Sequence, residues 1–185
     1  MATAPINIPD IHTERLLLRK IYPEDIGHVY RGLSDPEVIR FYGVSYATRE
    51  ETQKQMDWYA DLEKEGTGIF WAVWVKQEAN TRAFAGVGGV YDIHPVNRKA
   101  EIGFWLLPEF WGMGIMKEAT DLILAHCFEV LDLHRIEGYV EAGNEACKSA
   151  LRKIGFTHEG TMRECEFKDG KFISEEIWAL LNNRI

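Results

Sequence analysis

The stretch from residue 101 to residue 120 limits the folds open to this chain more than any other. An apolar run over residues 102–107 stops at Pro108, and Gly112 and Gly114 come directly before a helical pattern. This order predicts a strand, a glycine turn and a helix. Glycines let the backbone approach a ligand closely, and unpaired N–H groups at the start of a helix attract anions. The stretch is therefore typical of a pyrophosphate site, although an ordinary helix entry that contains glycines is an equal alternative.

Length and composition indicate one globular domain. With 185 residues, 46% of them apolar, the chain can bury a sizeable core, and we expect residues 1–185 to form a single domain. No apolar run approaches the ~20 residues that a membrane span needs. The first ten residues lack the basic region of a secretory signal. A cytoplasmic protein without membrane contact is therefore predicted.

Cysteine usage and charge narrow the classes of ligand. Cys127, Cys147 and Cys165 are odd in number and show no C-x-x-C spacing, which predicts free thiols and no zinc site. The histidines are scattered without metal-ligand spacing, so no metal is expected. A formal charge of −8 argues against a nucleic-acid partner and is compatible with a cationic substrate, although acidity also simply aids solubility.

Periodicity and turn signals predict alternating strands and helices. A capping pattern, with Thr48 as cap and Glu51 reaching back, starts the helix expected over residues 48–64. Other helices are expected from Pro23 and from Pro36, and over residues 115–130 and 144–154. Strands are expected over residues 13–21, 69–76, 83–93, 100–107, 134–140, 156–167 and 172–180.

The order of these elements predicts the topology of the sheet. Three consecutive strands within residues 69–107 favour an antiparallel meander. The strand, helix and strand within residues 100–140 imply a parallel crossover. Asp169 and Gly170 form a strong hairpin signal between the last two strands. The predicted fold class is therefore α/β with a mixed sheet.

Four separate stretches of the sequence are distinctive, and their order agrees with that of the predicted strands and helices. They are residues 13–19 (TERLLLR), residues 100–105 (AEIGFW) leading into 111–115 (WGMGI), Asn144 and Cys147 before 153–156 (KIGF), and Glu159, Gly160 and Arg163. Together they resemble the GNAT family of N-acetyltransferases, and within it the ribosomal-protein alanine and serine N-terminal acetyltransferases. The resemblance covers nearly the whole chain. It implies a single-domain fold with a mixed, mostly antiparallel sheet flanked by helices, two splayed strands, and acetyl-coenzyme A as co-substrate without a metal.

The same resemblance assigns the residues that bind the coenzyme. The family's glycine turn holds the pyrophosphate through backbone N–H groups, and Asn144 matches an asparagine near the pantetheine arm. Trp111 replaces the usual Arg or Gln, and Met116 replaces a small residue, so the side-chain contribution at these two positions is open. The turn falls on Trp111, Gly112, Met113, Gly114, Ile115 and Met116. The strand edge that bonds to the pantetheine arm falls on Trp105, Leu106 and Leu107.

Acetyl transfer to an amine requires a base, and two carboxylates match positions used as bases in relatives. Glu166 matches the ribosomal branch, and Glu101 matches the histone-acetyltransferase branch. Each also has a structural alternative. Glu101 could pair with Arg98 or Lys99, and Glu166 could be one exposed charge of its strand.

Cys147 stands where the ribosomal branch commonly has serine, which is proposed to help protonate the leaving thiolate. A thiol is only a weak hydrogen-bond donor, and a buried core thiol is the common alternative. We expect direct transfer without an acetyl-cysteine, because no activating base for the thiol is evident. Leu151 stands where some relatives use a tyrosine as general acid, and leucine cannot act in this way.

The acceptor is predicted from the branch resemblance alone to be a protein α-amine, such as a ribosomal-protein N-terminus. The alternatives are a small amine, for example a polyamine or an amino-sugar antibiotic, and a sensor that binds acyl-coenzyme A with little catalysis. A homodimer is common in the family. Lys148 and Arg152 could reach the coenzyme's phosphates or form a solvated helix face. Five aromatic residues could line an acceptor pocket or belong to the core: Phe41, Tyr42, Trp58, Tyr59 and Trp71.

Overall fold

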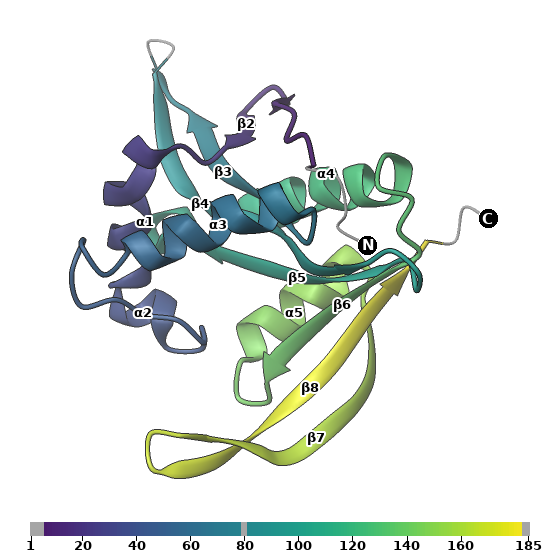
Figure 1. The fold of residues 1–185 in the computed structure, drawn as a ribbon. Coiled ribbons are helices and arrows are strands. Elements are labelled where there is room, and N and C mark those ends of the chain that lie inside the picture. Colours follow the sequence, from purple (N-terminus) through teal and green to yellow (C-terminus); the bar gives the residue numbers. More distant parts are fainter. Residues whose placement is uncertain (1–5, 79–80, 183–185) are drawn as a thin grey trace.

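One mixed sheet organises this computed structural model, which describes residues 6–78 and 81–182 (Figure 1). Within these residues the sheet has eight strands in the order β1-β2-β3-β4-β5-β6-β8-β7. Neighbouring strands are antiparallel except β5 and β6, which are parallel. The strands are β1 (Ile11–His12), β2 (Leu16–Lys20), β3 (Ile69–Lys76), β4 (Arg82–His94), β5 (Lys99–Leu106), β6 (Arg135–Glu141), β7 (Thr157–Lys168) and β8 (Lys171–Leu181).

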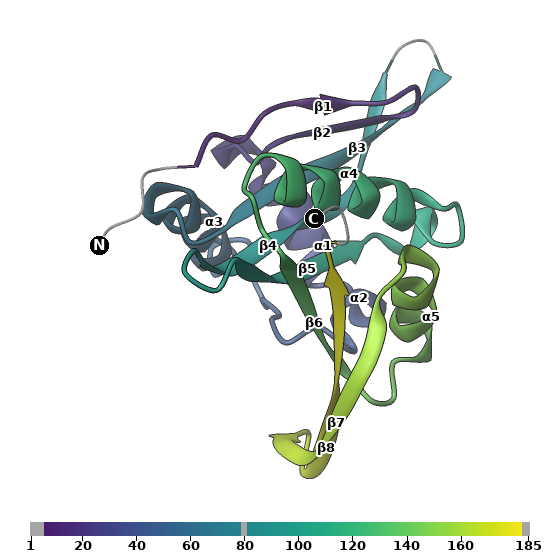
Figure 2. The ribbon, with the colours of Figure 1, turned by 90° about the vertical axis from the view of Figure 1, so that its right-hand side faces the viewer.

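Helices cover both faces of this sheet. Helices α1 and α3 pack on one face, and α4 and α5 contact each other on the opposite face (Figure 2). The helices are α1 (Ile26–Leu33), α2 (Pro36–Ile39), α3 (Gln53–Glu65), α4 (Ile115–Glu129) and α5 (Glu145–Ile154), with short 3₁₀ turns η1 (Pro23–Asp25) and η3 (Pro108–Phe110). None of them is long and apolar enough to cross a membrane.

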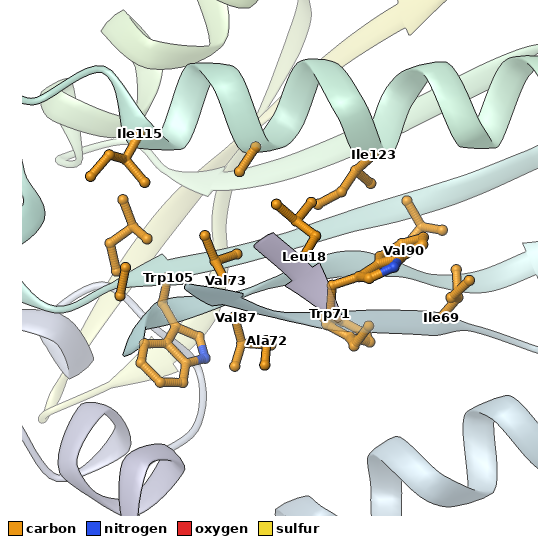
Figure 3. Close-up of a cluster of buried hydrophobic side chains, with 14 of the residues drawn as sticks. Leu18, Ile69, Trp71, Ala72, Val73, Val87, Val90, Trp105, Ile115 and Ile123 are labelled. Carbon is orange, nitrogen blue, oxygen red and sulfur yellow. The ribbon is translucent and has the colours of Figure 1, made fainter. Parts of the chain in front are cut away.

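The core lies on both sides of the central strands, because successive side chains of a strand point to opposite faces. Figure 3 shows Ile115 and Ile123 of α4 above the sheet, facing Leu18 and Val73. Trp105 points to the other face. All five side chains are buried. Both layers of helices are therefore held by apolar contacts with the same strands, which fixes α4 and its preceding turn against β5.

The expected topology is confirmed. The strands β3, β4 and β5 form the antiparallel meander, and β5, α4 and β6 form the parallel crossover. The last two strands form a long hairpin that extends away from the rest of the sheet (Figure 1). Its two-residue turn has positive φ at both Asp169 (50°) and Gly170 (79°), as a type I′ turn requires.

The helix expected from Thr48 begins later than its capping pattern predicts, because α3 covers Gln53–Glu65. The Thr48 hydroxyl does accept a hydrogen bond from the Glu51 N–H at 3.1 Å, but the Glu51 carboxylate accepts from the Ala47 N–H. The buried Thr52 hydroxyl donates to the Thr48 carbonyl at 3.0 Å. Such local bonds between side chains and backbone compete with regular helix, which explains the delayed start.

Candidate functional site

The strands β5 and β6 pair only where they begin. Their ladder joins Lys99, Ala100 and Glu101 of β5 to Arg135, Ile136 and Glu137 of β6. Beyond these pairs, β5 continues to Leu106 and β6 to Glu141, and Figure 1 shows the two strands diverging. The divergence opens the middle of the sheet at the place where α4 begins. These are the two strands expected to splay.

Two cavities occupy this region. The smaller cavity has a volume of about 730 Å³ and is lined by the end of β5, the glycine turn and α5. The larger cavity has a volume of about 1080 Å³ and is lined by the segment from α2 to Tyr46, by β5 and β6, and by the β7–β8 hairpin. Both cavities are lined by one shared set of residues: Pro36, Arg40, Phe41, Tyr42, Phe104, Met116, Asn144, Cys147 and Ala150. The shared lining shows that the cavities adjoin.

The glycine turn has the geometry of an anion site. Gly112 and Gly114 have φ of 73° and 74°, a conformation that residues with a side chain rarely adopt. Both line the smaller cavity, together with Ile115, Met116 and Lys117 of the first turn of α4. The N–H groups of a first helical turn have no partner within the helix. The residues present therefore fit a ligand that carries phosphate.

Every residue assigned to the coenzyme from sequence lines the smaller cavity except two. Leu107 is 1% exposed, and its N–H donates to the Ala85 carbonyl of β4 at 2.8 Å. Met113 is exposed, and its carbonyl accepts a hydrogen bond from Arg15. Backbone groups alternate along an antiparallel strand, so Trp105 also directs its N–H and C=O toward β4. The open edge of β5 therefore belongs to Phe104, which the sequence did not single out, and to Leu106.

Two of the predicted binding residues also have structural tasks. The Trp111 indole N–H donates to the Leu106 carbonyl at 2.8 Å, so this side chain fastens the turn to the end of β5. The Asn144 side chain caps α5 and accepts a hydrogen bond from the Cys147 N–H at 3.1 Å. Trp111 therefore replaces the family's Arg or Gln with a neutral group that binds protein backbone.

The cations beside the smaller cavity differ from those suggested by the sequence. Lys148 is buried and binds the Ala142 carbonyl at 2.7 Å and Glu176 at 3.0 Å. Arg152 lies over the ring of Trp178, 5.0 Å from its centre. Neither of these side chains lines the smaller cavity. The residues of α5 that line the cavity are Ala146, Cys147, Ser149, Ala150 and Lys153, and α4 adds Lys117.

Glu101 lies where the strands separate, in the last pair of the β5–β6 ladder, opposite Glu137. Its side chain lines the larger cavity and accepts a hydrogen bond from the Tyr91 hydroxyl. Burial, together with the negative charges of Glu137 and Glu175, raises the pKa of Glu101 to about 7. A carboxylate with this pKa exchanges protons readily near neutral pH.

The cations expected to neutralise this carboxylate have other partners. Arg98 pairs with Asp132, and the Lys99 ammonium donates to Glu137 at 3.0 Å. Arg135 donates to the other oxygen of Glu137 at 2.7 Å. Although burial acts to raise the pKa of Glu137, the hydrogen bonds from Arg135 and Lys99 hold it below its ordinary value. Glu101, which lines the larger cavity, therefore has a raised pKa, whereas Glu137 has a lowered one.

The other predicted base, Glu166, lies on the β7–β8 hairpin opposite Ile173 and is exposed. It lines the larger cavity from that side. Lys168 ties the hairpin to the rest of the site, because its ammonium donates to the Arg40 carbonyl at 3.1 Å and to Glu141 at 2.9 Å. Glu101 and Glu166 thus belong to one cavity but to different environments.

Cys147 and Tyr42 line both cavities and carry a proton that can be transferred. Burial raises the pKa of the Cys147 thiol to about 11, so it stays protonated at neutral pH. Burial, with the nearby Tyr59 and Tyr46, raises the pKa of Tyr42 well above its ordinary value. Sequence reasoning considered Tyr42 only as part of a pocket wall, and its position between the cavities adds it to the candidate residues.

The aromatic residues named from sequence divide between cavity and core. Phe41, Tyr42 and Trp58 line the larger cavity. Tyr59 and Trp71 are 6% and 0% exposed and belong to the core. Within the described residues, no group of three or more His, Cys, Asp or Glu side chains is placed to hold a metal ion.

Comparisons with known proteins agree with this geometry. The model of the acetyltransferase (GNAT) domain family matches residues 15–157. The uncharacterised N-acetyltransferase YoaA of Bacillus subtilis is 29% identical and is aligned over 95% of this chain and 98% of its own length. YdaF of the same species, provisionally named a ribosomal N-acetyltransferase, is 32% identical over 68% of this chain and 65% of its own.

Solved structures share the fold. The ribosomal L7/L12 α-N-protein acetyltransferase RimL in complex with coenzyme A has a TM-score of 0.82 at 23% identity, covering 94% of this chain and 98% of its own. Spermidine N-acetyltransferase from Vibrio cholerae, in complex with coenzyme A and spermine, has a TM-score of 0.78 at 19% identity. The match covers 91% of this chain and 96% of that protein's chain. Because the domain model matches residues 15–157, which is most of the chain, this chain belongs to the GNAT family and is an acetyl-coenzyme A-dependent N-acetyltransferase.

Proposed function

We propose that this enzyme transfers the acetyl group directly to the α-amine of a polypeptide, with Glu101 as the base. The observation that carries the proposal is the position of Glu101 at the separation of β5 and β6, inside the larger cavity. Acetyl-coenzyme A supplies the activated thioester from the smaller cavity. The amine enters from the larger one, and the residues that line both cavities surround the point of transfer.

The pKa of Glu101 favours an α-amine over an alkyl amine. An α-ammonium loses its proton near pH ~8, whereas an alkyl ammonium does so near pH ~10. The pKa of Glu101, about 7, is closer to that of an α-ammonium than to that of an alkyl ammonium. Transfer of a proton to Glu101 therefore costs less free energy from an α-ammonium. The freed lone pair forms the C–N bond as the C–S bond breaks. The proton goes to Glu101, directly or through a water molecule.

The reaction also requires a donor to the oxygen on which negative charge develops and a proton for the departing thiolate. The Phe104 N–H lies on the open edge of β5, and Phe104 lines both cavities, so it can donate to the carbonyl oxygen on which negative charge develops. The departing sulfur takes a proton from Cys147 or Tyr42, and the second proton that the nitrogen loses on becoming an amide restores that group. The raised pKa of Cys147 argues against a thiolate nucleophile, which supports direct transfer without an acetyl-cysteine.

A polyamine is the second candidate acceptor, and the charge of the larger cavity favours it. Five carboxylates line this cavity beside aromatic rings: Glu101, Glu141, Glu166, Asp169 and Glu175. Carboxylates and aromatic faces both attract ammonium groups. This lining suits an acceptor that carries a second positive charge.

Three acceptors separate these candidates. The first is a short peptide that begins with Ser or Ala and lacks lysine, the second is the same peptide with a blocked N-terminus and an added lysine, and the third is spermidine. We expect acetylation of the first peptide, with kcat/KM at least about tenfold above that of the other two. Acetylation of spermidine alone would favour the polyamine and overturn the α-amine assignment.

A further inference from the structure

Arg15 reaches the glycine turn from a distant part of the chain. It lies between β1 and β2, and its guanidinium Nη1 donates to the Met113 carbonyl at 3.1 Å. Its Nε donates to Glu118, which lies in the first turn of α4. Arg15 is not among the residues that line the smaller cavity. It therefore holds the turn from the side away from that cavity.

The bond to Met113 sets the direction of one peptide unit. In a trans peptide the C=O and the following N–H point in opposite directions, and the described chain contains no cis peptide. Because the Met113 carbonyl points to Arg15, the N–H of Gly114 points the other way. Gly114 lines the smaller cavity, so this N–H is directed toward the ligand. Met113 lies between two glycines with positive φ, Gly112 and Gly114, and the freedom of these glycines means that the peptide needs an anchor of this kind to keep its direction.

The bond to Glu118 removes an electrostatic conflict. A carboxylate in the first turn of α4 would repel an anion bound at the same helix end. Both oxygens of this carboxylate are engaged, one by Arg15 and the other by the Thr13 hydroxyl at 2.7 Å. Thr13 is oriented in turn, because its oxygen accepts from the Leu16 N–H at 2.9 Å. The positive charge of Arg15 compensates Glu118 where the pyrophosphate is expected.

We propose that Arg15 is a positioning residue for the pyrophosphate of coenzyme A. It directs the Gly114 N–H into the smaller cavity and neutralises Glu118, without touching the ligand. The proposal concerns the donor and is independent of the acceptor. A failed acceptor assignment therefore leaves it intact, and a failure of the proposal leaves the acceptor assignment intact.

The test compares two ligands that differ in the pyrophosphate. Arg15→Met keeps the aliphatic stem and removes both hydrogen bonds. We expect calorimetry to show coenzyme A binding weakened by about tenfold or more, since a hydrogen bond that orients a charged contact has a large effect. With S-acetylpantetheine as donor, which lacks the pyrophosphate, kcat/KM should change less than about twofold. An equal loss for coenzyme A and pantetheine donors would overturn the proposal.

Arg98→Met is the matched control. Arg98 is similarly exposed, and its guanidinium also binds a backbone carbonyl and a carboxylate, both of Asp132. Arg98 lines neither cavity, so its replacement should leave coenzyme A affinity unchanged. Thermal unfolding of both variants reports whether the fold is retained.

A double variant separates the two effects of Arg15. In Arg15→Met/Glu118→Gln the uncompensated charge is gone, but the Met113 carbonyl still lacks its anchor. We expect coenzyme A affinity to stay at least about fivefold below that of Glu118→Gln alone. Full recovery in the double variant would overturn the orienting role, because charge compensation alone would then explain Arg15.

Discussion

Glu101 and Glu137 face each other in the last pair of the β5–β6 ladder, and their surroundings shift their pKa values in opposite directions: burial and nearby negative charges raise that of Glu101, and hydrogen bonds from two cations lower that of Glu137. Glu137 receives hydrogen bonds from Lys99 and Arg135, while Glu101 receives one from the neutral Tyr91 hydroxyl. The charged Glu137 thus helps to keep a proton on Glu101 up to neutral pH. Two titratable groups with pKa values pushed apart are a common basis for assigning an acid–base role.

Glu101→Gln should lower kcat with the preferred amine by about a hundredfold, because general base catalysis contributes effects of this size. The wild-type rate should fall as pH decreases through about 7, where Glu101 takes up a proton. The variant should lack this limb of the pH profile. Steady-state rates between pH 5.5 and 9 provide the measurement.

Glu166→Gln is the control for that experiment. Glu166 lines the same cavity but is exposed on the hairpin, so we expect its replacement to reduce kcat by less than about fivefold. A larger loss at Glu166 than at Glu101 would move the role of base to the hairpin. Equal losses below about tenfold at both positions would exclude a dedicated carboxylate base.

The raised pKa of Glu101 also predicts a pH-dependent effect on stability. The folded protein binds this proton more tightly than the unfolded chain does, since the pKa rises from 4.5 to about 7 on folding. The stability linked to Glu101 is therefore complete below pH 4.5 and is lost as pH rises through about 7. Glu101→Gln should be more stable relative to wild type at pH 8 than at pH 5. Chemical unfolding at the two pH values measures the difference, and a constant difference would contradict the assignment.

Replacement of Cys147 should leave most of the activity. Its thiol is protonated at neutral pH, so no covalent acetyl-enzyme is expected. Cys147→Ala should retain at least about a tenth of the wild-type kcat, as befits a residue that shares proton donation with Tyr42. Intact mass measured after mixing with acetyl-coenzyme A alone should show no added acetyl group on Cys147. A stoichiometric acetyl-cysteine would refute direct transfer.

Two lysines of α5 should respond in opposite ways. Lys153 lines the smaller cavity, so Lys153→Ala should weaken coenzyme A binding several-fold, with a weaker dependence on salt and an unchanged Tm. Lys148 is buried against Glu176, so Lys148→Ala should lower Tm because it removes the ammonium that compensates the charge of that carboxylate. Calorimetry with coenzyme A and thermal unfolding distinguish the two outcomes.

Most of the fold could be predicted from residues close together in sequence. Gly66 and Gly155 end their helices with positive φ, and Asp169 and Gly170 form the expected turn, because such conformations depend on only a few neighbouring residues. The start of α3 was predicted less well. There, Thr52 adds a side-chain bond that the capping pattern does not contain.

The candidate site could be predicted only in part. The glycine turn is recognisable in the sequence because its two glycines directly precede a helix. The direction of each backbone group on β5 depends on its register with β4, which is why the open edge falls on Phe104 and Leu106. The choice of Lys153 over Lys148 depends on how α5 is rotated against the sheet.

The sequence by itself determined the order of strands and helices, the glycine turn and the family resemblance, because these depend on side-chain periodicity and local backbone preference. Only the tertiary structure distinguished Glu101 from Glu166 and brought Arg15 to Met113. A pKa depends on burial and on charges within a few ångströms, and a peptide's direction depends on its hydrogen-bond partner. Residues far apart in the chain supply both, and folding alone brings them together.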